Sequence, residues 1–268
     1  MIWAVAADND VSRLGRLHGR RVVVTGSGGI SLAVAELAVQ AGASVHMIAR
    51  DEETMHARSA EHPGYGWSFA DLSVDEETAR AFSEAASQLG GIDGLVAVAG
   101  GSARSLGDGA IDQLTGDALR STIDLNLTTT ANSLREFLSQ VNAPDTKHCA
   151  AVLIGSVLAS SPASPLFVTH GYAAAKAGIE GLARSAAAHY AQQRVTVNVV
   201  AAGLTRTAMS KRAQSDLVVS QYATRRQPLT VDGFLEPEDI AEACCWLLGA
   251  ATVTGQIVTV DGGWSVFG

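Results

Sequence analysis

The chain has few charged residues and no extended basic cluster. Charged residues make up 17% of its 268 residues, the net charge is −8, and adjacent basic residues occur only as isolated pairs such as Arg20-Arg21 and Lys211-Arg212. A nucleic-acid partner is therefore not expected. Apolar residues make up 47% of the chain, which is enough to build a well-buried core and argues against disorder.

Cysteine is also scarce. Cys149, Cys244 and Cys245 are an odd number without metal-ligand spacing, and two of them are adjacent, which places them poorly for a structural disulfide. They fit a reducing, cytoplasmic compartment. The histidines show no ligand spacing either, so the sequence predicts no metal site.

Long apolar runs are missing. No stretch approaches the roughly 18 uninterrupted apolar residues of a membrane-spanning helix. The segment Met1–Ala7 is briefly apolar, but it has no basic flank and Asp8 interrupts it, so we expect no signal peptide. Residues 1 to about 18 are interpreted as an extension before the first strand.

A repeating order of short apolar strands and helices follows. Strands without polar alternation, separated by helices, are typical of parallel strands that are buried on both faces. With right-handed crossovers, about seven such strands form one doubly wound α/β sheet of the Rossmann type, with helices on both faces. The predicted strands are Arg21–Thr25, Ser44–Ala49, Gly66–Phe69, Gly94–Val98, Ala150–Ile154, Val195–Val200 and Ile257–Val260.

Several helix ends can be predicted. A helical pattern covers Leu32 to Ala41. A second helix is expected to start at Ser73, because Glu76 follows three residues later as in a capping box. Another is expected near Pro237, where acidic residues in the first turn suit the helix dipole.

A glycine-rich turn leads directly from the first strand into the first helix. Its residues are Gly26-Ser27-Gly28-Gly29-Ile30-Ser31, with the spacing G-x-G-x-x-S. Glycines let the backbone approach a pyrophosphate, and the helix N-terminus supplies free N–H groups and the positive end of a dipole. The turn therefore predicts a dinucleotide site.

Tyr172 and Lys176 are four residues apart at the start of a predicted helix that runs to about Gln192. This spacing puts both side chains on one helix face. We expect the ammonium to lower the pKa of the phenol toward working pH and make it a proton donor and acceptor. Ser156, at the end of a predicted strand, would orient a substrate oxygen beside it.

In this order, the segments resemble the short-chain dehydrogenase/reductase family from about Leu17 to Gly263. The glycine turn is one residue shorter than the family's T-G-x-x-x-G-I-G, and Ser31 replaces its last glycine. Ala97-Val98-Ala99-Gly100 corresponds to the family's N-N-A-G but lacks both asparagines, and Ala202 replaces a proline. The ending Val260-Asp261-Gly262-Gly263 also resembles the family.

The resemblance implies roles for individual residues. The implied catalytic residues are Asn126, Ser156, Tyr172 and Lys176, with Ser160 and Ser161 as alternatives to Ser156. The implied cofactor-binding residues are Gly26, Ser27, Gly29, Ile30, Arg50, Asp71, Leu72, Ala99, Gly100, Tyr172, Lys176, Leu204 and Thr207. Among these, the backbone of Leu204 and the hydroxyl of Thr207 would hold the nicotinamide carboxamide, and Asn126 would hold a water that relays protons to Lys176.

The residue at the end of the second predicted strand helps to distinguish NAD from NADP(H) as the cofactor. An acidic residue there would bond the ribose 2′-hydroxyl of NAD, but this chain has Ala49 followed by Arg50. An arginine can pair with a 2′-phosphate through its planar fork, so NADP(H) is favoured, although Asp51 lies next to it.

We therefore expect an NADP(H)-dependent oxidoreductase that interconverts a carbonyl and an alcohol on a small organic substrate. Two alternatives remain: a non-redox isomerase, cyclase or dehydratase that uses the same Tyr and Ser, and a binding or scaffolding protein with a vestigial site. Residues 19–268 are taken as one domain, with a mobile lid at Leu204–Leu229. Arg225 and Arg226 of this lid are candidates for meeting an acidic substrate, but a solvated lid surface is favoured. The resemblance also implies a homodimer or homotetramer.

Overall fold

A parallel sheet of seven strands runs through the described part of the chain, which comprises residues 17–141, 148–163 and 165–267 of a computed structural model. The strand order is β3-β2-β1-β4-β5-β6-β7, and the crossovers reverse direction between β1 and β4. The predicted doubly wound α/β fold is confirmed. Residues 1–16 of the predicted extension lie outside the described residues, whereas Leu17 is buried and packs into the core.

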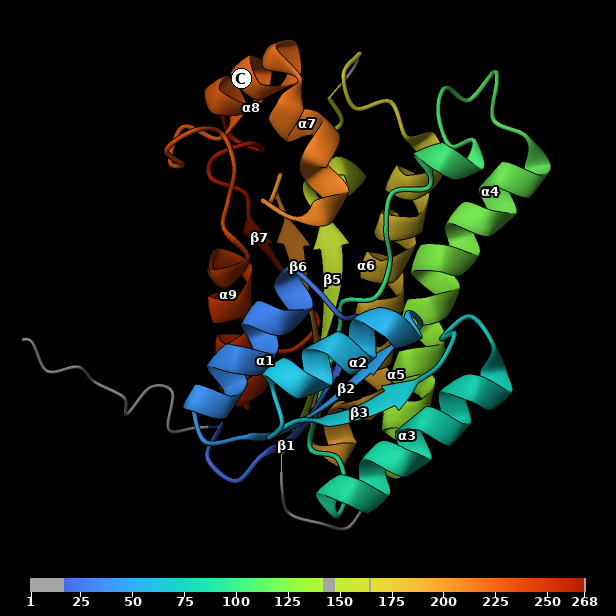
Figure 1. The fold of residues 1–268 in the computed structure, drawn as a ribbon, viewed down its shortest axis with the longest axis vertical. Helices are drawn as coiled ribbons and strands as arrows, with labels where there is room; N and C mark the ends of the chain where they lie inside the picture. The colour runs from blue at the N-terminus through green and yellow to red at the C-terminus, as the bar shows by residue number, and fades with distance from the viewer. Residues whose placement is uncertain (1–16, 142–147, 164, 268) are drawn as a thin grey trace, which may run out of the picture.

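The elements follow one another as strand, helix, strand over most of the chain (Figure 1). The strands are β1 (Arg21–Thr25), β2 (Ser44–Ala49), β3 (Gly66–Phe69), β4 (Gly94–Ala97), β5 (Cys149–Ser156), β6 (Val195–Ala202) and β7 (Ile257–Val260). The α-helices are α1 (Ile30–Gln40), α2 (Glu52–Glu61), α3 (Asp75–Leu89), α4 (Gly116–Ile123), α5 (Thr129–Gln140), α6 (His170–Tyr190), α7 (Lys211–Ser215), α8 (Leu217–Arg226) and α9 (Pro237–Gly249).

Both faces of the sheet are buried, as the unalternating apolar strands predict. In β1, Val22 and Val24 pack into a cluster that includes α1 and α9, whereas Val23 packs into a cluster that includes α3, α5 and α6. Successive side chains of a strand point to opposite faces, so a continuous apolar strand fills both layers.

Two strands are longer than predicted. β5 extends through Ser156 and β6 through Ala202, and their last residues pair with each other. The polar or small residues at these ends hide the strand signal, but the ladder continues because the backbone groups still find partners. Ser156 therefore lies at the end of a buried strand, as predicted.

The predicted capping box at Ser73 and Glu76 is wrong. Helix α3 begins at Asp75, and the N–H and hydroxyl of Ser73 both donate to Asp71 Oδ1, at 2.9 and 2.7 Å. Asp71 competes successfully because an aspartate readily accepts hydrogen bonds from the residue two positions later in a turn. The helix predicted near Pro237 is confirmed as α9.

The segment between β6 and α9 contains α7 and α8 and lies over the carboxyl ends of β5 and β6 (Figure 1). Among the described residues, no helix is long and apolar enough to cross a membrane. The same part of the chain contains no group of three or more His, Cys, Asp or Glu residues that could hold a metal ion.

Candidate active site

A cavity of about 1350 Å³ opens at the carboxyl ends of the strands, where ligands bind in doubly wound sheets. It extends from the end of β2 to the start of α6. All but one of the predicted site residues line it, namely Gly26, Ser27, Gly29, Ile30, Arg50, Asp71, Leu72, Ala99, Gly100, Ser156, Tyr172, Lys176, Leu204 and Thr207. Asn126 is fully buried and does not line the cavity.

The shortened glycine turn still forms a tight strand-to-helix connection. Gly26 has φ 99°, and a Cβ there would lie 2.4 Å from Ser31 Oγ. Gly29 has φ 51°, and its Cβ would lie 2.8 Å from Cγ2 of Thr207, which approaches from the loop after β6. Both positions therefore require glycine, and the backbone beside α1 stays open to a phosphate-bearing ligand.

Asn126 braces the loop that follows β4. Its Oδ1 accepts the Gly101 N–H, and its Nδ2 donates to the carbonyl oxygens of Gly101 and Thr122, all within 3.1 Å. It lies in a π-helical turn, Asp124–Thr128, between α4 and α5. Both amide hydrogens of Asn126 are used, so the side chain can only accept a hydrogen bond from a further water.

Thr25 completes the support of the same loop. Its hydroxyl oxygen accepts the N–H groups of Val98 and Ala99, at 3.0 and 2.9 Å. The loop that lacks the family's two asparagines is thus held by side chains from β1 and from the π-helical turn.

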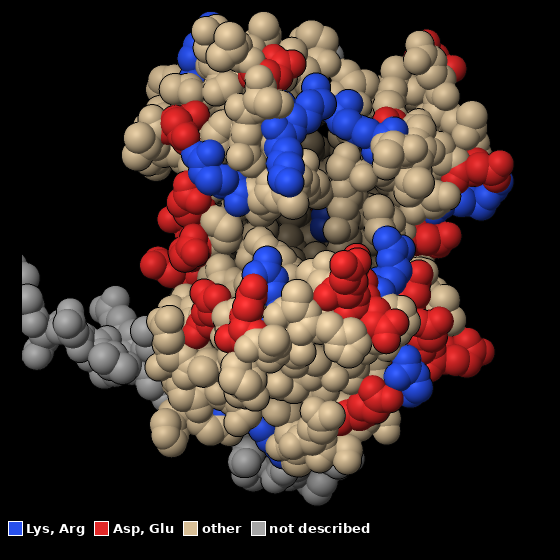
Figure 2. All heavy atoms as spheres, viewed as in Figure 1, with Lys and Arg blue, Asp and Glu red and all other residues tan. Residues whose placement is uncertain are grey.

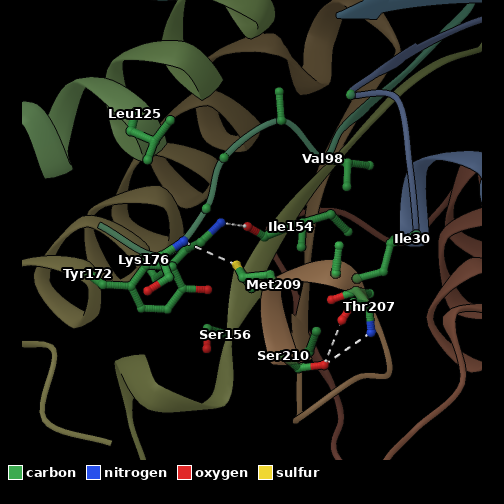
Figure 3. Close-up of a pocket in the computed structure, with 18 of the residues that line it drawn as sticks. Ile30, Val98, Leu125, Ile154, Ser156, Tyr172, Lys176, Thr207, Met209 and Ser210 are labelled. Atoms are coloured by element: carbon green, nitrogen blue, oxygen red, sulfur yellow. Dashed lines mark hydrogen bonds between the residues drawn. The ribbon is translucent and has the colours of Figure 1, made fainter. Parts of the chain in front are cut away.

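Ser156, Tyr172 and Lys176 come together at one end of the cavity, as predicted (Figure 3). The Lys176 ammonium lies 5.7 Å from the centroid of the Tyr172 ring and donates to the Ile154 carbonyl at 2.8 Å. Lys176 is only 4% exposed. Helix α6 supplies two of the three side chains, and the end of β5 supplies the third.

The expectation that Lys176 lowers the pKa of Tyr172 is wrong for the chain without ligands. Burial raises the pKa of the phenol, and a hydrogen-bonding interaction with Ser156 opposes only part of that rise. Burial also lowers the pKa of Lys176 to about 8, because a buried ammonium is poorly solvated. Burial is thus the main cause of the pKa shift of each group and favours the neutral form of both.

Asp108 is a site residue that the sequence analysis missed. Its carboxylate is buried and accepts the N–H groups of Gly171 and Tyr172, each at 2.9 Å. These N–H groups belong to the first turn of α6 and have no partners within the helix. Since Asp108 is 64 residues before Tyr172, no local capping pattern could have revealed this contact.

The Leu204 backbone, which is predicted to hold the nicotinamide, is already hydrogen-bonded within the protein. Its N–H donates to Oε1 of Gln227 at 2.8 Å, and its carbonyl accepts from Nε2 of Gln227 and from the Leu235 N–H. The Thr205 N–H, by contrast, has no hydrogen-bond partner among the described residues, and Thr205 lines the cavity. Within the described part of the chain, a donor without a partner therefore lies one residue after Leu204.

At the opposite end of the cavity, Nη1 of Arg50 lies 3.6 Å from Oδ2 of Asp71. The Arg50 side chain is 65% exposed. Asp51 is the N-cap of α2, and its Oδ1 accepts the Thr54 N–H at 2.6 Å. This hydrogen bond is the main cause that lowers the pKa of Asp51. The carboxylate next to Arg50 is therefore already engaged in helix capping.

The two adjacent arginines of the predicted lid do not line the cavity, which agrees with the favoured interpretation of a solvated surface. Arg225 and Arg226 are absent from its lining, and the Arg226 guanidinium instead lies 5.6 Å from the Trp264 ring centroid. Two other arginines, Arg104 and Arg212, do line it. Ser160 and Ser161, the alternatives to Ser156, also lie outside the lining.

The chain is similar to known reductases and dehydrogenases over most of its length. A family model described as enoyl-(acyl carrier protein) reductase matches residues 24–265. The chain is 31% identical over 245 residues to carbonyl reductase family member 4 of Xenopus tropicalis, covering 90% of this chain and 95% of that one. It is 32% identical over 260 residues to cis-4-hydroxycyclohexanecarboxylate dehydrogenase of Sinomonas cyclohexanicum, covering 94% and 99%.

A solved short-chain type dehydrogenase/reductase from Mycobacterium ulcerans superposes with a TM-score of 0.84 at 30% identity, covering 93% of this chain and 91% of that one. The chain belongs to the short-chain dehydrogenase/reductase family. It is an oxidoreductase, and the family implies a nicotinamide cofactor.

Proposed function

We propose that the enzyme is an NADP(H)-dependent oxidoreductase that interconverts a carbonyl and an alcohol on a small organic substrate. The observation that carries the proposal is the meeting of Ser156, Tyr172 and Lys176 in one cavity with the glycine turn after β1. The relatives named above are a carbonyl reductase and a cis-4-hydroxycyclohexanecarboxylate dehydrogenase, and both names support redox chemistry over the non-redox and scaffolding alternatives.

The glycine turn and the loops after β2, β4 and β6 would hold the dinucleotide, with the Thr205 N–H as a free donor near the reactive end. When bound, the nicotinamide supplies or accepts hydride. Tyr172 gives its phenolic proton to the substrate oxygen, and Ser156 donates a hydrogen bond to the same oxygen. Lys176, close to the ring, stabilises the phenolate that results.

The raised pKa of Tyr172 is compatible with this role. A neutral phenol is the form that donates a proton, and the positive charge of an oxidised nicotinamide next to it would favour the phenolate after transfer. Asn126 would accept a hydrogen bond from a water that carries protons toward Lys176, through the part of its Oδ1 that Gly101 leaves free.

The preference for NADP(H) rests on Arg50. Its ion pair with Asp71 is exposed and therefore weak, so the guanidinium is available to a 2′-phosphate. Asp51 is occupied by the N-terminus of α2, which reduces its value as a partner for the 2′-hydroxyl of NAD.

The test is a panel of small and cyclic ketones assayed with NADPH and with NADH, together with fluorescence titration of both cofactors. We expect tighter binding of NADPH and turnover of at least one ketone. Failure to bind either cofactor at about millimolar concentration, near −4 kcal/mol of binding free energy, would favour the non-redox alternative.

We further expect a homodimer or homotetramer and a cytoplasmic location. The three cysteines, Cys149, Cys244 and Cys245, are an odd number without metal-ligand spacing, which supports a reducing compartment. A sizing column tests the oligomeric state.

A further inference from the structure

Two arginines line the substrate end of the cavity and are not used by the chemistry above. Arg104 follows β4 in a short 3₁₀ helix, Arg104–Leu106, and Arg212 is the second residue of α7. They come from opposite walls, more than 100 residues apart in the sequence. Ser156 and Tyr172 line the same cavity.

A contact across the cavity brings these two walls together. The Ser102 N–H lies 3.2 Å from Sδ of Met209, which precedes α7 (Figure 3). Arg104 lies two residues after Ser102, and Arg212 lies three residues after Met209. Arg212 also donates through Nη2 to the Leu166 carbonyl at 3.2 Å, in the loop that follows Ser156. The guanidinium of Arg212 is thus hydrogen-bonded to the loop that follows Ser156.

The two guanidinium groups are near enough to repel each other. Burial lowers the pKa of Arg104, the charge of Arg212 lowers it further, and Asp108 acts in the opposite direction. Both oxygens of Asp108 already accept backbone N–H groups of α6. Among the described residues, neither arginine has a carboxylate within ion-pair distance. Outside the cavity, by contrast, Arg21 has one such partner and Arg206 has two.

The positive charge of Arg104 and Arg212 is opposite in sign to the net charge of the whole chain. The net charge is −8, yet Figure 2 shows Lys and Arg side chains gathered along the upper rim of the central hollow, with Asp and Glu mostly below it. Asp124, an acidic residue of the lining, accepts a hydrogen bond from Thr128 at 3.0 Å. Asp51 and Asp71 lie at the Arg50 end. An unpaired pair of like charges at a cavity mouth concentrates anions there.

We propose that Arg104 and Arg212 bind an anionic group of the substrate, such as a carboxylate, while Ser156 and Tyr172 hold its carbonyl oxygen. This inference rests on the proposed function and adds the substrate class to it. Planar guanidinium groups match the geometry of carboxylate, phosphate and sulfonate oxygens, and two of them fix the orientation of a substrate as well as its affinity.

The test compares three ligands of nearly the same shape: 4-oxocyclohexanecarboxylate, its carboxamide and cyclohexanone. Dissociation constants are measured by calorimetry with NADPH present, and kcat/KM is measured for the same three. We expect the carboxylate to bind about tenfold more tightly than the carboxamide, since the arginines are exposed and each contributes modestly. The preference should shrink at roughly 0.5 M salt, where exposed charges are screened.

Arg104→Gln and Arg212→Gln should each reduce this preference, and the double variant should abolish it with little change for cyclohexanone. Arg225→Gln is the matched control, because Arg225 is an exposed arginine of α8 outside the cavity lining. The control variant should keep the full preference.

Equal affinity for the carboxylate and the carboxamide in the unaltered enzyme would overturn the inference, and so would a preference that survives the double variant. Weaker NADPH binding in both variants with the preference intact would assign the pair to cofactor phosphates instead, which also overturns it. Binding without turnover of any ligand would count against the proposed function alone, since the calorimetric comparison does not depend on catalysis.

Discussion

At the residue scale, the proposed preference for NADP(H) rests on the single exposed side chain of Arg50. Arg50→Ala should weaken NADPH binding about tenfold or more, because it removes a charge-assisted hydrogen-bond donor to the 2′-phosphate, and should leave NADH binding nearly unchanged. Fluorescence titration of both cofactors measures this. Arg58→Ala is the control, since Arg58 is an arginine of the neighbouring α2 whose ion pair with Glu61 lies outside the cavity. An equal loss for both cofactors would contradict the assignment.

The sequence predicts some features of individual site residues but not others. Ser156, Tyr172 and Lys176 are predictable from spacing and strand position because the i, i+4 geometry of a helix is local. The pKa of Tyr172 is predicted in the wrong direction because its burial depends on the surrounding loops. The hydrogen bond from the Leu204 N–H to Gln227 could not be predicted, because the partner is 23 residues away and no local pattern shows it.

At the element scale, the start of α6 depends on a carboxylate from another loop. Asp108→Ala removes the acceptor for the Gly171 and Tyr172 N–H groups and should destabilise the enzyme by about 1 kcal/mol, as the loss of a helix cap does. It should also lower kcat about tenfold to a hundredfold by letting Tyr172 shift, with cofactor affinity retained. Asp108→Asn keeps one acceptor and should restore part of kcat.

The control for this element is Asp117→Ala, which removes an exposed aspartate of α4 that pairs with Arg120. A merely structural role for Asp108 would lower the free energy of unfolding without changing kcat below the melting transition. Steady-state kinetics and urea unfolding of the same samples separate the two cases.

Elements themselves are predicted well where their signals are local. The seven strands follow from apolar runs, and α9 follows from Pro237 and the acidic residues after it. The start of α3 is misplaced because Asp71 and Ser73 form a turn of their own, which competes with helix capping. The hydrogen bonds by which Asn126, in the π-helical turn, braces Gly101 depend on tertiary contacts and could not be predicted.

At the scale of the whole molecule, burial of Lys176 should appear in the pH dependence of unfolding. Its pKa is about 8 in the folded chain, against 10.5 for a fully solvated lysine. Between these values the unfolded state binds more protons, so the contribution of Lys176 to the free energy of unfolding rises with pH, by up to about 1.4 kcal/mol per pH unit. Below pH 8 both states are protonated and the contribution is constant.

Urea unfolding without cofactor at several pH values from 7 to about 10 tests this linkage. The stability difference between the unaltered enzyme and Lys176→Met should increase in favour of the unaltered enzyme as pH rises above 8. Lys211→Met, which removes an exposed lysine of α7, should show no such trend. A difference that stays flat across this range would mean that Lys176 is not desolvated in the folded chain.

The central claim is that the Tyr172 phenol exchanges a proton with the substrate beside a bound dinucleotide. The most direct measurement compares kcat and NADPH affinity in Tyr172→Phe with those of Tyr190→Phe, a control tyrosine of the same helix that lies outside the cavity lining. We predict that Tyr172→Phe binds NADPH nearly as well as the unaltered enzyme and loses roughly 100-fold or more of kcat, whereas Tyr190→Phe keeps both. Unchanged turnover in Tyr172→Phe would contradict the account.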